Sequence, residues 1–171
     1  MSSIYLTKSL REVLEYNNVN PDTDYAPAYN GESAGLDLYN CGDTVTISSA
    51  SYRNVTIDSY HNDKKFKALI PTGLKVIIPK GYVGLIQERG SITKTPLKVR
   101  AGVIDSGYTG EIFINCINVG KEHFNIHTGA KLPFQLVVVK SDNEFKVIDE
   151  EEYLNASSTS SRKEGKVGSS D

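Results

Sequence analysis

The stretch AGVIDSGYTGEI, from Ala101 to Ile112, places an acid and an aromatic residue, Asp105 and Tyr108, between two apolar runs. Asp, Ser and Gly are common turn residues, so the pattern predicts a β-hairpin with both side chains at its tip. A surface hairpin whose Asp caps its own turn would explain the acid and the glycines. Nothing about such a turn requires an aromatic ring, and Tyr108 therefore makes this tip the first candidate site.

A second polar group follows an apolar run in GYVGLIQERGSITKTPLKV, where Glu88, Arg89, Gly90 and Ser91 precede a helical turn that Pro96 cuts short. Ser is a good helix N-cap, and a helix N-terminus beside an arginine can bind an anion. The alternative is that Arg89 and Glu88 pair on the surface while Gly90 makes a turn.

Two further polar residues interrupt runs that otherwise have the pattern of strands. Asp37 lies between Leu36 and Leu38 in ESAGLDLYNCG. Because Asp is a poor strand residue, either an edge position or a role in a polar network or near a cation must explain it. Gln135 interrupts the apolar run in TGAKLPFQLVVVK, and a buried Gln needs partners in backbone groups or in a ligand.

The cysteines and histidines show no metal-binding pattern. Cys41 and Cys116 are far apart and lack CxxC or Cys/His spacing, which disfavours a zinc site and a disulfide scaffold and indicates a reducing compartment. The three histidines, His61, His123 and His127, have no acid or cysteine at ligand spacing, and we assign them no metal-binding or catalytic role.

The charge balance excludes two large classes of partner. Lys and Arg total 19 against 21 for Asp and Glu, and the formal charge of -2 gives no reason to expect binding of nucleic acid or of a membrane surface. The N-terminal residues lack the apolar core of a signal peptide, and no run approaches the roughly 18 apolar residues of a membrane span. We expect a soluble protein of the cytoplasm, or of the host cytoplasm if the source is viral.

The elements that must position these residues are mostly strands. Apolar runs of strand length recur between turn signals in KALIPTGLKVIIPKGYVGLIQE, AGVIDSGYTGEIFINCINVG, NIHTGAKLPFQLVVVK and FKVIDEEEYL. Helix is predicted only for SLREVLEYN near the start, with a short turn after Ser91. The 171 residues therefore predict a single all-β domain, a sandwich or barrel with one short helix.

Composition divides the chain into a domain and an arm. Residues 1–154 form the predicted β domain, with a polar insertion at about 41–66 in which TVTI and RNVTI could form an extra hairpin. Residues 155–171, NASSTSSRKEGKVGSSD, have too little apolar surface to order themselves, and we predict a flexible C-terminal arm.

Taken in order, these segments resemble the five motifs of the trimeric, all-β dUTPase family, which hydrolyses dUTP to dUMP and pyrophosphate. The first motif resembles SAGLDLY, from Ser33 to Tyr39, and the third resembles AGVIDSGYTGEI. The others resemble ERGSITK, GAKLPFQLV and RKEGKVGSS. Five such motifs in order along one small β-rich chain identify it as similar to this family.

Three positions depart from the usual motifs. Gly90 follows Arg89 where the family usually has Ser, and Ser91 is the substitute that the resemblance indicates. Gln135 stands one residue further along than the common spacing, which a small bulge could absorb. Val167 replaces the Phe that usually covers the uracil, and base stacking on such a ring is typically worth about 1 to 3 kcal/mol.

The resemblance implies a role for each candidate residue. Asp105 would deprotonate the water that attacks the α-phosphorus, and Tyr108 would lie under the deoxyribose. Uracil would be bound by backbone groups around Gly102, Val103 and Ile104. The triphosphate would be held by Arg89, Gly90, Ser91 and Gln135, with Arg162, Val167, Gly168, Ser169 and Ser170 of the arm closing over it.

The resemblance also implies a jelly-roll or β-clip barrel that forms a homotrimer, with three subunits contributing to each site. The cofactor would be Mg²⁺, held chiefly by the phosphates and water with no direct protein ligand, and Asp37 would lie close to it in an outer shell. Such an enzyme limits uracil in DNA and supplies dUMP for dTMP synthesis.

Two other functions remain as alternatives. A dCTP deaminase shares the fold and the hairpin, but it needs a catalytic Glu on the next strand, where this chain has Asn115, which cannot shuttle a proton. A nucleotide-binding regulatory trimer of low activity is the second alternative. It would bind a regulatory protein through the 41–66 insertion, and the departures at Gly90 and Val167 are its only support.

Overall fold

The chain is described by a computed structural model over residues 2–27, 32–49, 67–141 and 146–158. The strands are β1 (Ser3–Leu6), β2 (Gly35–Tyr39), β3 (Val45–Ile47), β4 (Lys67–Ile77), β5 (Tyr82–Glu88), β6 (Leu97–Arg100), β7 (Val103–Ile104), β8 (Glu111–Asn118), β9 (Phe124–Ile126) and β10 (Lys131–Lys140). The helices are α1 (Lys8–Tyr16), the 3-10 helix η1 (Gly90–Lys94) and α3 (Glu150–Ser158).

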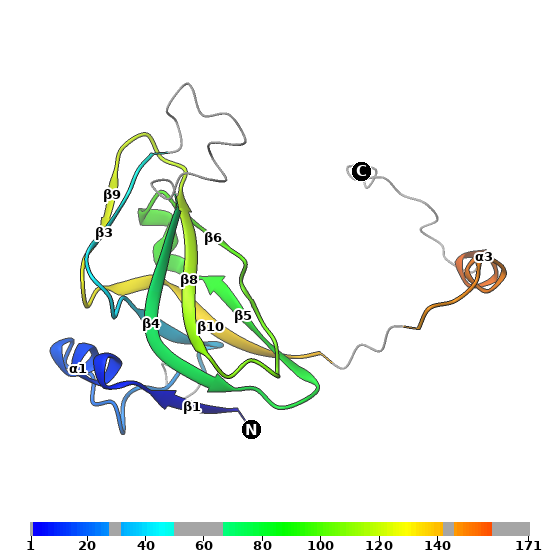
Figure 1. The fold of residues 1–171 in the computed structure, drawn as a ribbon, viewed down its shortest axis with the longest axis horizontal. Helices are drawn as coiled ribbons and strands as arrows, with labels where there is room; N and C mark the ends of the chain where they lie inside the picture. The colour runs from blue at the N-terminus through cyan, green and yellow to red at the C-terminus, as the bar shows by residue number, and fades with distance from the viewer. Residues whose placement is uncertain (1, 28–31, 50–66, 142–145, 159–171) are drawn as a thin grey trace.

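The strands form two four-stranded antiparallel sheets and one small two-stranded sheet (Figure 1). The first sheet has the order β1-β4-β8-β6, and the second has the order β2-β10-β5-β7. The third sheet pairs β3 with β9. The predicted all-β architecture is confirmed, and α1 is the one short helix that packs against it.

Alternating side chains place the core inside the β body. On β8 the side chains of Ile112, Ile114 and Cys116 are fully buried, whereas the residues between them are less buried. The second sheet contributes Leu38 and Phe134, which are also fully buried. Burial of each large apolar side chain stabilises the fold by about 1.5 to 3 kcal/mol, so this alternation fixes which face of each strand is left for a site.

Helix α1 covers one side of the first sheet. Its predicted span began at Ser9 and ended at Asn17, one residue later at each end than in the structure. Thr7 is the N-cap, because its side-chain oxygen accepts a hydrogen bond from the Leu10 N–H at 3.3 Å. Gly73 on β4 has a φ of +65°, and a Cβ there would lie 2.7 Å from the Cβ of Leu10. Glycine therefore permits both the turn of the strand and the close approach of the helix.

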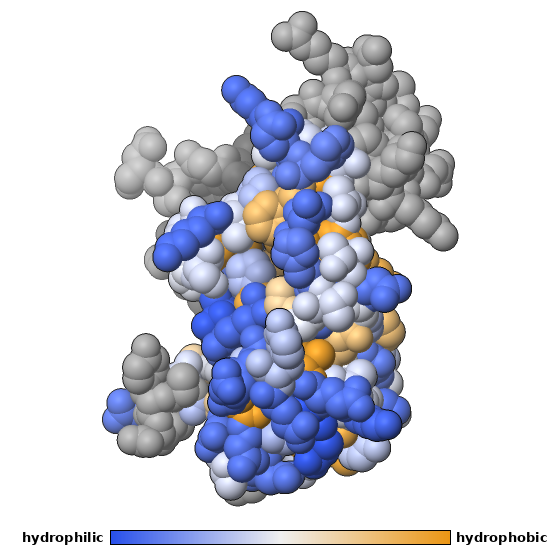
Figure 2. Space-filling model, turned by 90° about the vertical axis from the view of Figure 1, so that its left-hand side faces the viewer, coloured by the Kyte–Doolittle hydropathy of each residue, from blue (hydrophilic) through white to orange (hydrophobic). Residues whose placement is uncertain are grey.

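The surface is mostly hydrophilic on the side where α1 lies. Figure 2 shows this face with hydrophobic residues only in small separate patches, outside the residues drawn in grey. No helix among the described residues is long and apolar enough to span a membrane.

The predicted hairpin at Asp105 is right at its base and wrong at its tip. β6 pairs with the C-terminal half of β8, from Leu97 opposite Asn118 to Arg100 opposite Asn115. Beyond Arg100 the two arms separate, because β7 crosses to the second sheet and pairs with β5 instead. Ala101, at the crossing point, has a φ of 51°. This left-handed backbone turns the strand from one sheet toward the other.

Three other predictions of local structure are corrected. Ser91 is not an N-cap: η1 begins at Gly90, and Arg89 occupies the cap position without a side-chain cap. The TVTI segment pairs with β9 rather than with RNVTI, which lies outside the described residues.

The strand predicted for FKVIDEEEYL is also wrong for residues 146–154. Residues from Glu150 onward form α3, which buries none of its side chains and lies apart from the sheets in Figure 1. The Asp149 carboxylate accepts a hydrogen bond from the Glu152 N–H at 2.8 Å, which caps the helix start. The arm therefore begins with a helix, and its remaining residues from 159 lie outside the described part of the chain.

Candidate active site

The split hairpin encloses a pocket of about 180 Å³ where β7 and β8 separate. Its lining includes both residues that the sequence singled out at the tip, and the full set is Val103, Ile104, Asp105, Tyr108, Glu111, Ile112 and Phe113. β7 is an edge strand whose described pairing is with β5 alone. Its outer backbone groups therefore face the pocket with the donors and acceptors of an unpaired strand edge.

The turn that carries Asp105 is fixed by Tyr108. The Tyr108 N–H donates to the carbonyl oxygen of Asp105 at 3.0 Å. The Tyr108 hydroxyl donates to the carbonyl oxygen of Glu111 at 2.6 Å, which holds the ring across the loop. A Cβ on Gly110 would lie 2.6 Å from that hydroxyl oxygen, so the glycine makes room for the ring. The carboxylate of Asp105 is exposed and faces solvent in the single chain.

Glu111 and Phe113 line this pocket, although the sequence analysis did not name them as site residues. The Glu111 carboxylate accepts a hydrogen bond from the Gly73 N–H at 2.8 Å, so this acid is engaged by the fold. Their alternation on β8 put both on the less buried face, but only the opening of the hairpin turns that face into a pocket lining. Asn115, which replaces the deaminase Glu in our alignment, lies further along β8 and is half-buried.

A second cluster joins three of the predicted motifs on the second sheet. Asp37 on β2 and Gln135 on β10 lie directly opposite each other. Arg89, at the end of β5, binds the Asp37 carboxylate through Nε at 2.7 Å from Oδ1. This pairing answers the two open questions about Asp37, because the residue lies on an edge strand and also in a polar network.

Arg89 is also anchored to the backbone of β10. Its N–H donates to the carbonyl oxygen of Pro133 at 2.9 Å, and its Nη1 donates to the carbonyl oxygen of Leu132 at 3.3 Å. The alternative pairing of Arg89 with Glu88 does not occur, since Glu88 pairs with Lys98 at 3.3 Å. The guanidinium is thus held by Asp37 and β10 at a fixed position.

Gln135 is placed by a bulge, as its unusual spacing predicted. The register of β10 against β2 shifts between Lys131 and Gln135. The Gln135 amide nitrogen donates to the carbonyl oxygen of Glu88 at 3.4 Å, which is a backbone partner of the kind expected for this residue. A Cβ on Gly35 would lie 2.4 Å from Gln135 Oε1, so the side chain of Gln135 fills the space above this glycine.

Lys131, Tyr39 and Tyr25 complete this cluster and were missed in the sequence. Lys131 Nζ forms a very short contact with Asp37 Oδ2 and lies 5.9 Å from the centroid of the Tyr39 ring. The Tyr25 hydroxyl donates to the backbone carbonyl oxygen of Asp37 at 2.7 Å. Burial raises the pKa of Tyr25 far above its ordinary value, with a smaller contribution from Tyr39. Tyr25 therefore stays a neutral hydrogen-bond donor to the strand.

The two clusters do not meet within one chain. β2 and β7 are opposite edges of the second sheet, and Gln135 pairs with Gln87 whereas Ile104 pairs with Gly84. At ordinary strand spacings Asp105 lies about 14 Å across the sheet and about 13 Å along it from Asp37, or roughly 19 Å in all. Arg89 is turned toward β2, away from β7. The structure thus brings Asp37, Arg89 and Gln135 together and leaves Asp105 and Tyr108 apart from them.

The other predicted residues are either exposed nearby or outside the described chain. Gly90 and Ser91 are exposed at the start of η1, next to Arg89. Gly102 approaches β5 closely, where its carbonyl oxygen accepts a hydrogen bond from the Ile86 N–H at 2.7 Å. The arm residues Arg162, Val167, Gly168, Ser169 and Ser170 lie outside the described residues.

The described residues contain no group of three His, Cys, Asp or Glu side chains that could hold a metal ion. Asp37, the acid nearest to the cationic cluster, is already bound by two cations. This donor set suits a cation that enters already chelated by a phosphorylated ligand, and does not suit a resident ion in a protein cage.

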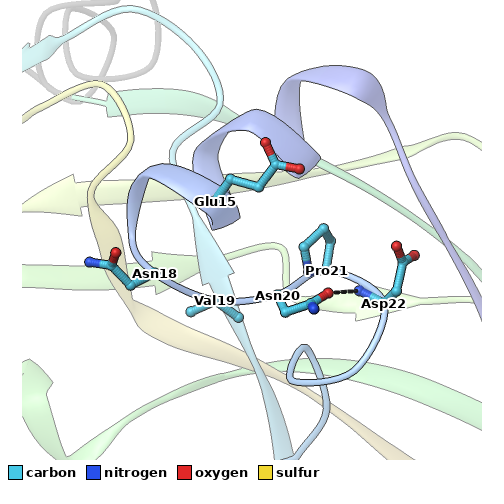
Figure 3. Close-up of a pocket in the computed structure, with 6 residues that line it drawn as sticks. All are labelled: Glu15, Asn18, Val19, Asn20, Pro21 and Asp22. Atoms are coloured by element: carbon cyan, nitrogen blue, oxygen red, sulfur yellow. Dashed lines mark hydrogen bonds between the residues drawn. The ribbon is translucent and has the colours of Figure 1, made fainter.

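A second pocket, of about 340 Å³, lies at the C-terminal end of α1 and is separate from both clusters (Figure 3). It is lined by Glu15, Asn18, Val19, Asn20, Pro21 and Asp22. The Asn20 side-chain oxygen accepts a hydrogen bond from the Asp22 N–H at 3.0 Å, which closes the loop on itself. None of the sequence-predicted site residues lines this pocket.

The fold and the two clusters define an all-β protein with a cationic site for an anionic ligand and a separate pocket beside a strand edge. Comparisons with known proteins identify the family within this class. A family model described as dUTPase matches residues 23–170. The chain therefore belongs to the dUTPase family, and the resemblance found in the sequence is confirmed.

Individual relatives agree with this assignment. The deoxyuridine 5'-triphosphate nucleotidohydrolase of Escherichia phage T5 is 42% identical over 86 residues, which cover 48% of this chain and 57% of the relative. The Pol polyprotein of equine infectious anemia virus (strain Wyoming) is 36% identical over 72 residues, and the match covers 42% of this chain but only 6% of the polyprotein.

Among solved structures, the dUTPase of Staphylococcus bacteriophage 80alpha with dUpNHpp superposes with a TM-score of 0.65 at 26% sequence identity. The superposition covers 99% of this chain and 98% of the other.

Proposed function

We propose that the chain hydrolyses dUTP to dUMP and pyrophosphate, with Mg²⁺ bound to the triphosphate as part of the substrate. The observation that carries the proposal is the pocket at the split hairpin, which holds an exposed carboxylate, an aromatic ring and an unpaired strand edge within one cavity. Membership of the dUTPase family and the structure of the 80alpha dUTPase with dUpNHpp support the same substrate.

The uracil would bind at the edge of β7. A strand edge offers backbone N–H and carbonyl groups in fixed order, which can match the donors and acceptors of uracil and reject the reversed pattern of cytosine. The narrow space between β7 and β8 would leave little room for a 5-methyl group. Tyr108, held by its hydrogen bond to Glu111, would lie under the deoxyribose and exclude a 2'-hydroxyl.

Asp105 would act as the general base. Its carboxylate would accept a proton from the water that attacks the α-phosphorus, and the bond from that phosphorus to the pyrophosphate oxygen would break. A positioned base typically contributes about 10²- to 10⁴-fold to the rate. Arg89, Ser91 and Gln135 would bind the phosphates, and the fixed guanidinium would stabilise the charge on the leaving pyrophosphate.

The separation of the clusters supports an assembly in which different subunits complete each site. The roughly 19 Å between Asp37 and Asp105 at ordinary strand spacings is too long for both to act on one α-phosphate from a single chain. We therefore propose a homotrimer, with the split-hairpin pocket of one subunit facing the cationic cluster of another. α3 buries no side chain against its own chain, which suits an arm that reaches a neighbouring subunit with Arg162 and the motif from Val167 to Ser170.

Mg²⁺ would supply charge neutralisation at the phosphates. The phage phi11 dUTPase of S. aureus coordinates a structural Mg(II) ion, and it superposes on this chain with a TM-score of 0.60 at 25% identity. In this chain Asp37 would stay in an outer shell, because Arg89 and Lys131 occupy its carboxylate oxygens.

The test is pyrophosphate release from dUTP, dCTP, dTTP and UTP in the presence of Mg²⁺. We expect turnover of dUTP alone and a loss of about 10²-fold or more in Asp105→Asn. Asp43→Asn is the matched control: it makes the same change at an exposed aspartate that contributes only a backbone carbonyl oxygen to the described hydrogen bonds. Tight dUTP binding without turnover would favour a binding module, and release of a uracil nucleotide from dCTP would favour a deaminase.

A further inference from the structure

Lys131 lies beside the cationic cluster but on the far side of its acid. The Asp37 carboxylate bridges two cations, with Arg89 on Oδ1 and Lys131 on Oδ2. The side chains of Asp37 and Arg89 are 23% and 26% exposed, so this bridge is partly shielded from water. The Lys131 stem passes over the Tyr39 ring, which fixes its direction toward Asp37.

The bulge in β10 makes this arrangement specific to the register of the two strands. Lys131 lies opposite Tyr39, and Gln135 lies opposite Asp37. On β2 the two partners are two residues apart, whereas on β10 they are four apart, so the bulged strand carries the extra length. Lys131 and Gln135 thereby approach Asp37 from two sides, and the carbonyl groups of the intervening residues hold Arg89.

The charges of the three residues determine what Lys131 does. Arg89 and Asp37 alone would form a pair of zero net charge, which attracts a phosphate weakly. With Lys131 the group has a net charge of +1, and the carboxylate is shared between two cations. Partial shielding from water makes such charges interact more strongly than fully exposed pairs do.

We propose that Lys131 is a positioning residue for the triphosphate site and acts through Asp37. By binding Oδ2 it holds the carboxylate in the orientation that fixes Arg89 Nε, and it offsets the negative charge that would otherwise weaken the attraction of Arg89 for phosphate. This inference rests on the proposed binding of dUTP at Arg89, and it assigns to Lys131 no contact with the nucleotide.

The experiment measures binding of the non-hydrolysable analogue dUpNHpp with Mg²⁺ by titration calorimetry, using the full chain. We expect Lys131→Met to raise Kd about tenfold and Lys131→Arg to restore binding to within about threefold of the original chain. Met keeps the apolar stem over Tyr39 and removes the charge. Lys8→Met is the matched control, since Lys8 is an exposed lysine on α1 whose ion pair with Glu12 is remote from the site.

A double-mutant cycle separates action through Asp37 from direct contact with phosphate. In an Asp37→Asn background we expect Lys131→Met to change Kd less than about twofold, because the charge through which it acts is gone. A loss of about tenfold in that background would overturn the positioning role. Equal loss in Lys131→Met and Lys131→Arg, together with a lower Tm in both, would also overturn it and indicate a structural role.

Turnover of dUTP distinguishes failure of this inference from failure of the proposed function. We expect the KM of Lys131→Met to rise by about the same factor as Kd, with kcat changed less than about threefold. If the original chain hydrolyses dUTP and Lys131→Met binds the analogue normally, the inference alone fails. If the original chain binds the analogue but releases no pyrophosphate from dUTP, the proposed function fails and the cycle still decides the role of Lys131. Absence of any binding by the original chain would overturn both.

Discussion

Gly102 is the position where the split hairpin depends most directly on the absence of a side chain. A Cβ there would lie 2.9 Å from the carbonyl oxygen of Ile86, and the first contact is with backbone rather than with a movable side chain. The Gly102 carbonyl oxygen also accepts the 2.7 Å hydrogen bond from the Ile86 N–H. Ile86 is paired with Leu136 in the middle of the second sheet, so β5 cannot move aside freely. In Gly102→Ala, β7 must therefore move away from β5.

The cost of this change follows from three contributions. Overpacking against backbone costs about 1 to 3 kcal/mol, and weakening of the hydrogen bond costs about 1 kcal/mol. Replacing Gly with Ala returns about 0.4 to 1 kcal/mol by restricting the unfolded chain. The net loss in free energy of unfolding is about 2 kcal/mol, and for a chain of this size Tm should fall by about 4 to 8 °C. Because β7 forms one wall of the pocket, KM for dUTP should rise as well.

Gly107→Ala provides the matched control for Gly102→Ala. Gly107 lies in the same loop, and a Cβ there would meet nothing within 4 Å. We expect its Tm to change by less than about 2 °C. Thermal unfolding and steady-state kinetics on the two variants test the reasoning. Equal Tm and equal KM in the two variants would show that the approach of Gly102 to β5 does not hold the pocket open.

Three further changes have expected outcomes. Gly35→Ala should leave Tm within about 2 °C and raise KM for dUTP, because the new Cβ displaces the movable end of Gln135 rather than backbone; unchanged kinetics would separate Gln135 from the site. Tyr108→Phe should lower the free energy of unfolding in urea by about 1 kcal/mol, since it removes the 2.6 Å bond to the Glu111 carbonyl oxygen; no loss would mean that the ring alone holds the loop. Burial raises the pKa of the Cys116 thiol from 9.0 to about 12, so above the lower value the unfolded chain releases a proton that the folded chain keeps. Stability from Cys116 is therefore complete below the lower value and should decline with rising pH between the two, by at most about 1.4 kcal/mol per pH unit. Urea titrations across this window, with Cys116→Val as the control, should show a smaller decline in the variant, and an equal decline would contradict the assignment to Cys116.

Periodicity predicted the elements wherever one face of a strand is buried. β8 alternates strictly, with Ile112, Ile114 and Cys116 inside, and such a pattern can be recognised without a structure. α3 was missed because Val147 and Ile148 suggested a strand. The signal against a strand was present in Asp149 and Glu152, which have the spacing of a helix N-cap and its partner.

The candidate site was predictable in its residues and not in its arrangement. Asp37, Arg89 and Gln135 stood out as polar residues within or next to apolar strands, but their meeting depends on which strands pair. Lys131 gave no signal, because an exposed lysine beside a turn is common, and only the bulge in β10 brings it to Asp37. The crossing of β7 to the second sheet depends on the left-handed backbone of Ala101, a residue type that does not usually mark such a turn.

The placement of the two clusters at opposite edges of one sheet makes abundance itself a control on the proposed enzyme. A newly made chain would carry two incomplete halves and contribute nothing until it meets further copies. At low expression, output would then climb more steeply than the amount of protein, because assembly depends on encounters between chains. Gene dosage would thus act as a threshold, and a cell would need no separate effector to keep sparse copies silent.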